Sequence, residues 1–220
     1  MSIVENLHKV KSLLPSNVNL IVVTKTQPID KLMEVYNCGH KIFGENKVQE
    51  LFDKYEVLPK DIEWHLIGHL QTNKVKFIAP FVSLIHSVDS LKLLQEINKQ
   101  AEKNQRIINC LLQIYIAEEE TKFGLSFSEA EELLSSLELK ALKNIKITGF
   151  MGMATNTEQT EQISSEFKSL KLFFDRQKNV QHLNVNLINL SMGMSSDYIS
   201  AIKNGSNMIR VGSSIFGERA

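Results

Sequence analysis

The sequence contains few cysteines and prolines and no long hydrophobic run. Its 220 residues include two cysteines, four prolines and one tryptophan. The two cysteines, Cys38 and Cys110, are too few for a disulfide scaffold, and each lies in a mostly apolar stretch. We therefore expect two buried thiols in a reducing compartment rather than a disulfide bond.

The chain also lacks an excess of charge of either sign. It has 25 Lys and Arg residues against 25 Asp and Glu residues, which gives a formal net charge of +0. This balance argues against a nucleic acid or an anionic membrane as the main partner. No apolar run is long enough to span a bilayer, and residues Met1–Leu7 lack the basic start and apolar core of a signal peptide. We therefore expect a cytoplasmic protein.

No feature of the sequence divides the chain into parts. It has no stretch rich in Pro, Gly or Ser, no low-complexity tract and no clear repeat. The composition is that of an ordinary globular protein, with 43% hydrophobic and 23% charged residues. We predict a single domain spanning residues 1–220, which is long enough for one α/β barrel.

Short apolar runs alternate with amphipathic stretches along the sequence. The apolar runs predict strands at Leu20–Thr24, Lys41–Phe43, Trp64–Ile67, Val82–His86, Ile108–Ile116, Lys146–Phe150, Val185–Asn189 and Met208–Arg210. The amphipathic stretches predict helices at Val4–Leu14, Lys31–Cys38, Ser90–Lys103, Glu158–Gln177 and Ser195–Asn204, with a capping box at Ser128 and Glu131. Eight strands that each lead to a helix indicate an α/β fold, a (β/α)8 TIM barrel with an extra N-terminal helix. A doubly wound sheet is the alternative, and it would need fewer strands.

Lys25 closes the first of these apolar runs. Burial disfavours the ammonium form of a lysine and favours the neutral, nucleophilic amine. Such an amine at the carboxyl end of a barrel strand can form a Schiff base with an aldehyde. The alternative for a lysine just past a strand is a surface side chain that extends to water.

A small-residue turn follows the last strand, at Gly212-Ser213-Ser214. Glycine lets the backbone approach a phosphate closely, and amides and hydroxyls donate hydrogen bonds to its oxygens. Barrels commonly build a phosphate site from the loops after strands seven and eight, and Ser191–Ser195 is the strand-seven loop. Together with Lys25, these loops predict a ligand that carries both an aldehyde and a phosphate.

Other polar residues at the predicted strand ends leave alternatives open. Arg210 interrupts an apolar strand, so it either pairs with an internal carboxylate or faces a ring nitrogen or phosphate of a ligand. Asn46 either contacts a ligand or caps the following helix. His65 and His69 are separated by Gly68 and a strand end, so we predict no metal site.

These residues also carry a family resemblance. The chain resembles the pyridoxal phosphate (PLP) homeostasis proteins called YggS or PROSC. The matching segments are Val22–Thr26, Phe43–Glu50, Trp64–Lys74, Lys122–Gly124, Gly149–Met151, Leu190–Asp197 and Arg210–Gly217. They span the chain nearly from end to end in the family's order. One departure is His69, where many relatives have proline or serine.

The resemblance implies a barrel like the N-terminal domain of alanine racemase, with PLP as its cofactor. It implies that Lys25 holds PLP as a Schiff base. It places Ser195, Gly212 and Ser213 around the phosphate. It also places Arg210 near the pyridine nitrogen and Asn46 beside the cofactor.

An arginine at the pyridine nitrogen disfavours catalysis. Arginine does not give up its proton in a protein, so the facing nitrogen stays unprotonated and the ring is a weaker electron sink. Alanine racemase adds a tyrosine base from a second, β-rich domain. We expect no such domain in a chain ending at Ala220, and the four tyrosines have no matching role.

We therefore expect a non-catalytic PLP carrier or regulator in PLP homeostasis and delivery. Its expected partners are PLP and apo PLP-dependent enzymes, and its expected state is a monomer or weak homodimer. Two alternatives remain: a PLP-dependent racemase or lyase with an unidentified base, and a Schiff-base aldolase acting on a sugar phosphate.

Overall fold

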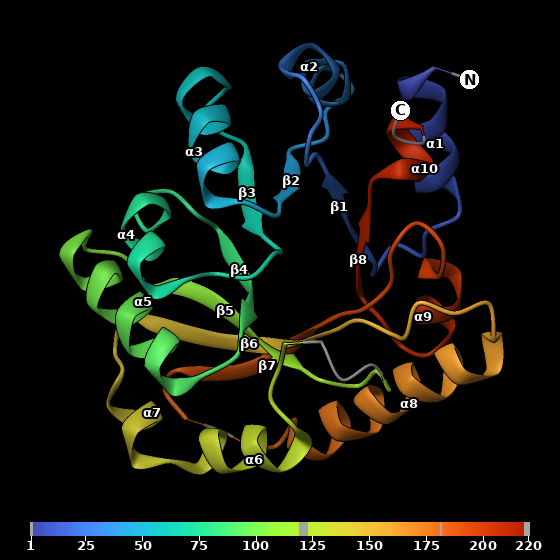
Figure 1. The fold of residues 1–220 in the computed structure, drawn as a ribbon. Helices are drawn as coiled ribbons and strands as arrows, with labels where there is room; N and C mark the ends of the chain where they lie inside the picture. The colour runs from blue at the N-terminus through green and yellow to red at the C-terminus, as the bar shows by residue number, and fades with distance from the viewer. Residues whose placement is uncertain (1, 119–122, 181, 218–220) are drawn as a thin grey trace.

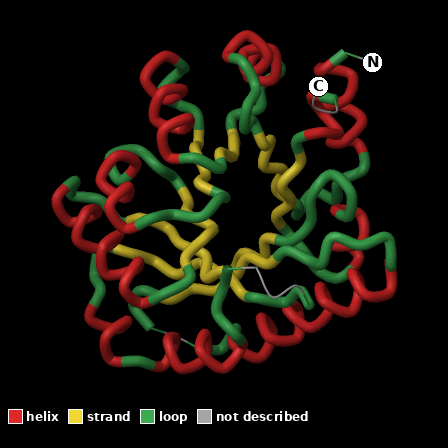
Figure 2. Tube along the Cα trace, in the orientation of Figure 1, coloured by secondary structure: helices red, strands yellow, loops and turns green. Residues whose placement is uncertain are grey.

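The computed structural model describes residues 2–118, 123–180 and 182–217. Within these residues, eight parallel strands in sequential order close into a barrel (Figures 1 and 2). The strands are β1 (Asn19–Val23), β2 (Ile42–Glu45), β3 (Glu63–Leu66), β4 (Leu84–Val88), β5 (Ile108–Ile114), β6 (Ile145–Gly152), β7 (Val185–Ser191) and β8 (Met208–Val211). The predicted (β/α)8 barrel is confirmed, and the doubly wound alternative is wrong.

Helices form an outer ring around the strands (Figure 2). In the described residues they are α1 (Ile3–Ser12), α2 (Ile29–Asn37), α3 (Val48–Val57), α4 (Val75–Ile78), α5 (Leu91–Lys103), α6 (Phe127–Ser135), α7 (Leu137–Ala141), α8 (Thr160–Gln177), α9 (Tyr198–Lys203) and α10 (Ser213–Phe216), with a short 3₁₀ turn at Thr72–Lys74. The predicted extra helix α1 lies beside α10 (Figure 1). There the Asn6 side chain donates to the Ile215 carbonyl at 3.0 Å.

Apolar side chains fill both faces of the barrel wall. The larger core lies between the strands and the helices and includes Phe43, Trp64 and Phe150, which are fully buried. A smaller cluster occupies the barrel interior and contains Ile21, Leu84, Leu111, Met151 and Met208. Strands buried on both faces explain the continuous apolar runs in the sequence, which parallel sheets require.

Two local predictions were wrong. The capping box before α6 uses Ser126 and Glu129, not Ser128 and Glu131: the Ser126 hydroxyl accepts from the Glu129 amide at 3.2 Å and Glu129 Oε2 accepts from the Ser126 amide at 2.8 Å. Strand β4 starts and ends two residues later than predicted, so His86 lies within the strand rather than at its end. The short helices α4, α7 and α10 and the helix α3 had not been predicted.

The β7–β8 seam has the sparsest pairing of the barrel. Only Ser191 and Met208 form a paired position between the two strands. Side chains just before β8 add to the seam: the Ser206 hydroxyl donates to the β7 carbonyl of Leu190 at 3.1 Å, and the Asn207 side chain accepts from the Leu190 amide at 2.7 Å. Polar side chains therefore supplement the backbone ladder between β7 and β8.

Two further sequence expectations bear on the chain as a whole. Both cysteines are free thiols, with Cys110 buried and Cys38 partly buried. Burial raises the pKa of the Cys110 thiol far above its usual value. Across the described residues, no helix combines the length and apolar character needed to cross a bilayer.

Candidate functional site

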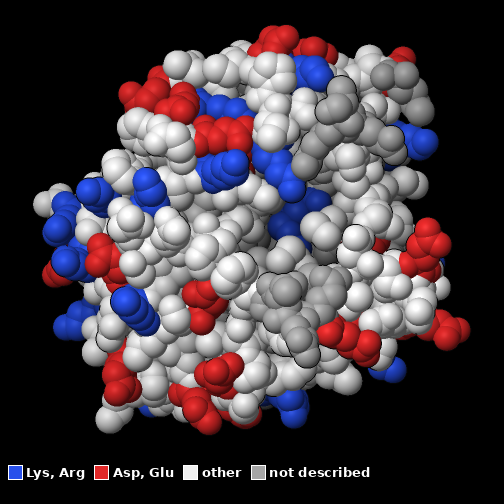
Figure 3. Space-filling view, viewed as in Figure 1, with Lys and Arg blue, Asp and Glu red and all other residues white. Residues whose placement is uncertain are grey.

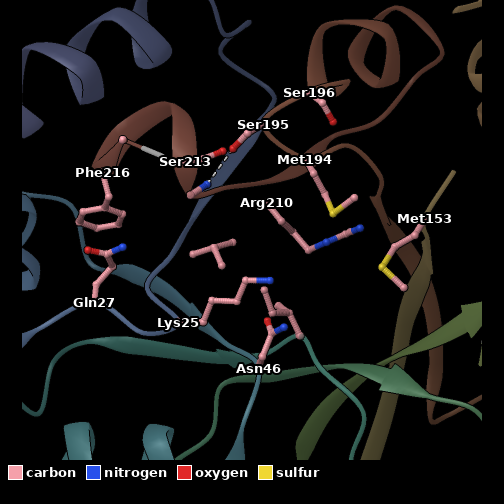
Figure 4. A pocket seen from close by; sticks show the side chains of 14 residues that line it. Lys25, Gln27, Asn46, Met153, Met194, Ser195, Ser196, Arg210, Ser213 and Phe216 are labelled. Carbon is pink, nitrogen blue, oxygen red and sulfur yellow. Dashed lines mark hydrogen bonds between the residues drawn. The ribbon is translucent and has the colours of Figure 1, made fainter. Parts of the chain in front are cut away.

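A pocket of about 300 Å³ lies at the carboxyl ends of β1, β2 and β8. All six residues predicted for the site line it, namely Lys25, Asn46, Ser195, Arg210, Gly212 and Ser213 (Figure 4). Its other lining residues include Gln27, Met153, Met194 and Phe216. The structure thus brings together side chains from four strand ends, where barrel proteins build their sites.

Lys25 lies two residues after the end of β1, and its amine points into the pocket (Figure 4). The side chain is partly buried. The next residue, Thr26, has φ of 63°, a conformation that a β-branched residue rarely adopts. Its amide donates to Oε1 of Glu50 at 2.5 Å. The backbone that carries the candidate nucleophile is therefore held in a strained turn by a specific contact.

A buried charge cluster supports the same segment from behind. The Lys54 ammonium donates to Glu45 Oε1 at 2.6 Å, to Glu50 Oε1 at 2.7 Å and to the Thr24 carbonyl at 2.7 Å. The Thr24 hydroxyl donates to Glu45 Oε1 at 2.5 Å. Burial raises the pKa of Glu45, and the neighbouring Lys54 charge opposes that rise. Thr24 and Thr26, which flank Lys25, are both tied to this cluster.

Donor groups gather on the Ser195 side of the pocket. The Ser195 hydroxyl oxygen accepts from the Gly212 amide at 3.1 Å and from the Ser214 amide at 3.3 Å. With both lone pairs engaged, the hydroxyl hydrogen of Ser195 can donate to a ligand. Ser213 begins α10 beside this group. Hydroxyl donors arranged in this way beside a glycine suit an anion such as a phosphate.

Arg210 is buried in β8 and reaches across the pocket (Figure 4). Its Nη1 donates to the carbonyl and hydroxyl oxygens of Ser191 at 2.9 and 2.6 Å, and its Nη2 donates to the Gly152 carbonyl at 3.1 Å. Burial lowers the pKa of Arg210 to about 10, partly offset by the charge of Asp197, so the guanidinium stays protonated at neutral pH. Within the described residues it forms no salt bridge, so no carboxylate there supplies the internal ion pair considered from the sequence.

Asn46 does not act as a helix cap. The N-cap of α3 is Lys47, and this cap receives no side-chain hydrogen bond. Asn46 instead lines the pocket below the Lys25 amine (Figure 4). A Cβ on Gly68 would lie 2.3 Å from the Asn46 carbonyl oxygen, so Gly68 is required for the backbone position of Asn46.

The two histidines considered as metal ligands lie in different environments. His65 is buried in the barrel interior, and its Nδ1 lies 3.1 Å from Nε2 of His86. His69 is exposed, with its Nδ1 3.5 Å from Asp89 Oδ2 and its ring stacked on Phe123. No group of three metal-ligating side chains occurs in the part of the chain that the structure describes.

Basic side chains collect at the entrance of the barrel. Figure 3 shows Lys and Arg atoms in a hollow near the middle of the face seen in Figure 1. Lys25 and Arg210 are the basic residues that line the pocket. The local positive charge attracts an anionic ligand even though the chain as a whole carries no net charge.

Comparison with known proteins identifies the family. The model of the alanine racemase N-terminal domain matches residues 1–220. A pyridoxal phosphate homeostasis protein of Aquifex aeolicus is 42% identical over 202 residues, which are 91% of this chain and 86% of the relative. One from Schizosaccharomyces pombe is 38% identical over 205 residues, 92% of this chain and 85% of the relative. The chain belongs to the pyridoxal phosphate homeostasis protein family.

Solved structures agree with this membership. PipY of Synechococcus elongatus PCC7942 without PLP is 34% identical, with a TM-score of 0.91 over 98% of this chain and 100% of PipY. PipY with PLP bound has a TM-score of 0.88 at 33% identity and the same coverage. An alanine racemase of Clostridium difficile 630 shares the fold, with a TM-score of 0.79 at 16% identity over 99% of this chain and 57% of the racemase.

The sequence did not predict some of the residues that support the pocket. The cluster of Glu45, Glu50 and Lys54 is one of these. Glu50 and Lys54 are four residues apart on α3, a helix that was not predicted, and Glu45 lies on a different element, β2. In the segment Phe43–Glu50, the residues alone singled out Asn46, and the remainder matched the family resemblance. Lys122, the first residue of another matching segment, lies outside the described residues.

Proposed function

We propose that this protein binds pyridoxal 5'-phosphate in the pocket around Lys25 and acts in PLP homeostasis as a carrier rather than as an efficient catalyst. The main observation behind the proposal is that one pocket of about 300 Å³ contains an amine, hydrogen-bond donors suited to an anion, and a guanidinium. Its relatives are named for PLP homeostasis, and PipY has been solved with PLP bound.

The residues present fit such a ligand. When bound, PLP would supply a reactive aldehyde and an aromatic ring with a phosphate arm. The Lys25 amine would bond covalently to the aldehyde carbon with release of water. The turn at Thr26 and the ion pairs behind it hold the lysine backbone in place for this bond.

The two polar ends of the pocket suit the two polar ends of the ligand. The Ser195 and Ser213 hydroxyls would donate to the phosphate, and the Gly212 amide would do so on exchanging its bond to Ser195 Oγ for one to a phosphate oxygen. Arg210 would face the ring nitrogen, where its fixed proton can donate but is not given up. Asn46 would lie beside the ring, opposite the Ser195 side.

The lining of the pocket supports a carrier over a catalyst. A racemase or lyase needs a positioned acid or base across from Lys25. The described lining includes Met153, Met194 and Phe216, and none of the four tyrosines of the chain is among these lining residues. We infer that the protein holds PLP reversibly and releases it to apo PLP-dependent enzymes.

The test is the visible spectrum of the purified protein after incubation with PLP, before and after borohydride. We expect a yellow band that borohydride removes, with a pyridoxyl group on Lys25 located by peptide mass spectrometry. Lys25→Ala should lose the band and the adduct. A wild-type protein that never forms the band would reject PLP binding at Lys25 and favour the sugar-phosphate aldolase.

Assays with D- and L-amino acids separate carrier from catalyst. The loaded protein should show no turnover above that of free PLP, and it should restore the activity of an apo PLP-dependent enzyme mixed with it. Steady racemisation or elimination by wild-type protein that Lys25→Ala abolishes would contradict the carrier assignment.

A further inference from the structure

A line of hydrogen-bonded polar side chains runs from Arg210 into the centre of the barrel. Arg210 Nη1 lies 2.6 Å from the Ser191 hydroxyl oxygen. That oxygen lies 3.1 Å from Nδ1 of His86, and His86 Nε2 lies 3.1 Å from Nδ1 of His65. All four side chains are buried, and they come from four strands, β8, β7, β4 and β3. Such groups are rare in an apolar core unless they are fully hydrogen-bonded.

The far end of this line opens on a second cavity. His65 lines a cavity together with Asn19, Glu63, Asn109 and others. Asn19 and Glu63 are the first residues of β1 and β3, so this cavity lies at the amino end of the barrel. The polar line thus connects the floor of the candidate cofactor pocket with the opposite end of the barrel.

Chemistry fixes the direction of each hydrogen bond. Arginine only donates, so the Ser191 oxygen accepts from Arg210. The Ser191 hydroxyl hydrogen is satisfied if it is donated to Nδ1 of His86. Reversing that bond would leave this hydrogen without an acceptor in a fully buried place, which costs free energy. His86 then carries its proton on Nε2 and donates it to Nδ1 of His65.

The same direction suits the charge of Arg210. Each of the three side chains turns its acceptor atom toward the guanidinium, so the dipoles of Ser191 and both histidines stabilise a cation. Burial lowers the pKa of His65 to about 3, and burial together with the charges of His65 and Arg210 lowers the pKa of His86 well below its usual value. Both imidazoles are therefore neutral at physiological pH, and the site keeps its positive charge.

The line also determines which donors Arg210 presents to the pocket. Both hydrogens of Nη1 bond to Ser191, and one hydrogen of Nη2 bonds to Gly152. In the described part of the chain, this leaves one hydrogen on Nη2 and the hydrogen on Nε. With one edge of the guanidinium fixed in this way, the remaining donors have a defined direction.

We propose that Ser191, His86 and His65 are positioning residues that hold Arg210 charged and aimed at the ligand, with His86 in the tautomer protonated at Nε2. This proposal rests on the proposed function for the identity of the ligand, but the state of His86 belongs to the protein itself. It assigns a role to two histidines that otherwise have no function in the pocket.

The first test is made on the protein without PLP. Two-bond ¹H–¹⁵N correlation spectra report which ring nitrogen of a histidine carries the proton. We expect His86 and His65 to be neutral, with the proton of His86 on Nε2, and we expect Ser191→Ala to change the ¹⁵N shift of His86 Nδ1. A proton on Nδ1 of wild-type His86 would overturn the proposal.

The second test measures the dissociation constant for PLP. Ser191→Ala and His86→Leu should each weaken binding about tenfold, since each removes a hydrogen bond that orders a charged group. His86→Asn should restore binding to within about threefold of wild type, because its side-chain amide can place an acceptor near the position of Nδ1. Ser206→Ala is the matched control: it also removes a buried hydroxyl, but one bonded to Leu190 and Met192 carbonyls rather than to Arg210.

The outcomes separate this proposal from the proposed function. If wild type forms the borohydride-sensitive adduct on Lys25 but Ser191→Ala and His86→Leu bind PLP as tightly as Ser206→Ala, the positioning role is wrong and the carrier function stands. If no adduct forms while His86 is protonated at Nε2 and responds to Ser191→Ala, the PLP assignment fails and the hydrogen-bonded line stands.

Discussion

The ammonium of Lys54 lies 2.6 Å from Oε1 of Glu45, and both side chains are buried. Nothing in this ion pair faces the ligand pocket, yet it bonds to the carbonyl of Thr24, the residue before Lys25. The ion pair therefore links the buried side of α3 to the backbone next to Lys25, the candidate nucleophile. A second oxygen of Glu45, Oε2, is buried without a hydrogen-bond partner, so the carboxylate depends strongly on Lys54.

Replacing Lys54 with methionine should destabilise the fold by about 3–5 kcal/mol, because it leaves the buried Glu45 carboxylate unpaired. Urea unfolding at pH 7 measures the loss, and Lys54→Met combined with Glu45→Gln should recover part of it. The control is Lys41→Met, which removes an exposed pair with Asp61 and should cost less than about 1 kcal/mol. Equal losses for the two single variants would contradict the role of burial.

The left-handed conformation of Thr26 gives a second prediction. Thr26→Gly should raise the free energy of unfolding by about 0.5–1 kcal/mol, because glycine adopts positive φ without a steric cost. It should also weaken PLP binding, because a flexible turn no longer fixes Lys25. Gln105→Gly relieves a similar φ of 54° after α5, away from the pocket. Gln105→Gly should gain similar stability and keep the PLP affinity of wild type. If Thr26→Gly and Gln105→Gly changed PLP affinity equally, the link between the Thr26 turn and Lys25 would be refuted.

Gly68 offers a test of the position of Asn46. In Gly68→Ala the new Cβ would meet the Asn46 backbone at 2.3 Å, so the Asn46 segment must move. We expect PLP affinity to fall by about tenfold, equivalent to about 1.4 kcal/mol. Gly39→Ala is the comparison, since a Cβ there meets nothing within 4 Å and only its φ of +78° is strained. It should lower stability by about 1 kcal/mol and leave PLP affinity unchanged.

Acid should destabilise the protein through its buried neutral histidines. Burial lowers the pKa of His40 to about 4, against about 6.5 in the unfolded chain. Between these values the unfolded state binds a proton that the folded state does not, so stability falls on acidification by about 1.4 kcal/mol per pH unit for this group. His40→Gln, which can keep the hydrogen bond to Ile42, should show a shallower loss between pH 6.5 and 4 in urea unfolding. If the unfolding free energies of wild type and His40→Gln changed equally with pH over that range, the low pKa assigned to His40 would be contradicted.

The sequence predicted the barrel because its strands are buried on both faces. Runs such as Leu20–Thr24 contain no alternation, and most of the runs precede a helical pattern, so the order of elements was readable without knowledge of contacts. The pocket residues were also predictable, because Lys25 and Gly212 each lie just after the end of a strand and the ends of parallel barrel strands meet. Their binding roles remain predictions.

The supporting residues were not predictable for geometric reasons. Glu45 and Lys54 meet only after α3 folds back against β2, which no sequence spacing reveals. His86 was assigned to the mouth of the barrel because the expected end of its strand was two residues early. A two-residue error keeps the side chain on the same face but moves it by about 7 Å along the strand, from the mouth into the barrel interior. The contact with Ser191 therefore depended on a boundary that apolar patterning defines poorly.

The sparse seam between β7 and β8 has a consequence for how the protein responds to occupancy. The loop after β7 carries Ser195 and the loop after β8 carries Gly212, so an anion held by both loops would also tie β7 to β8. Ligand that binds only the folded state raises the melting temperature in proportion to the logarithm of its free concentration. The melting temperature of this protein would therefore report the fraction of molecules that carry ligand. In a mixture, the molecules without ligand would unfold at a lower temperature than those with it.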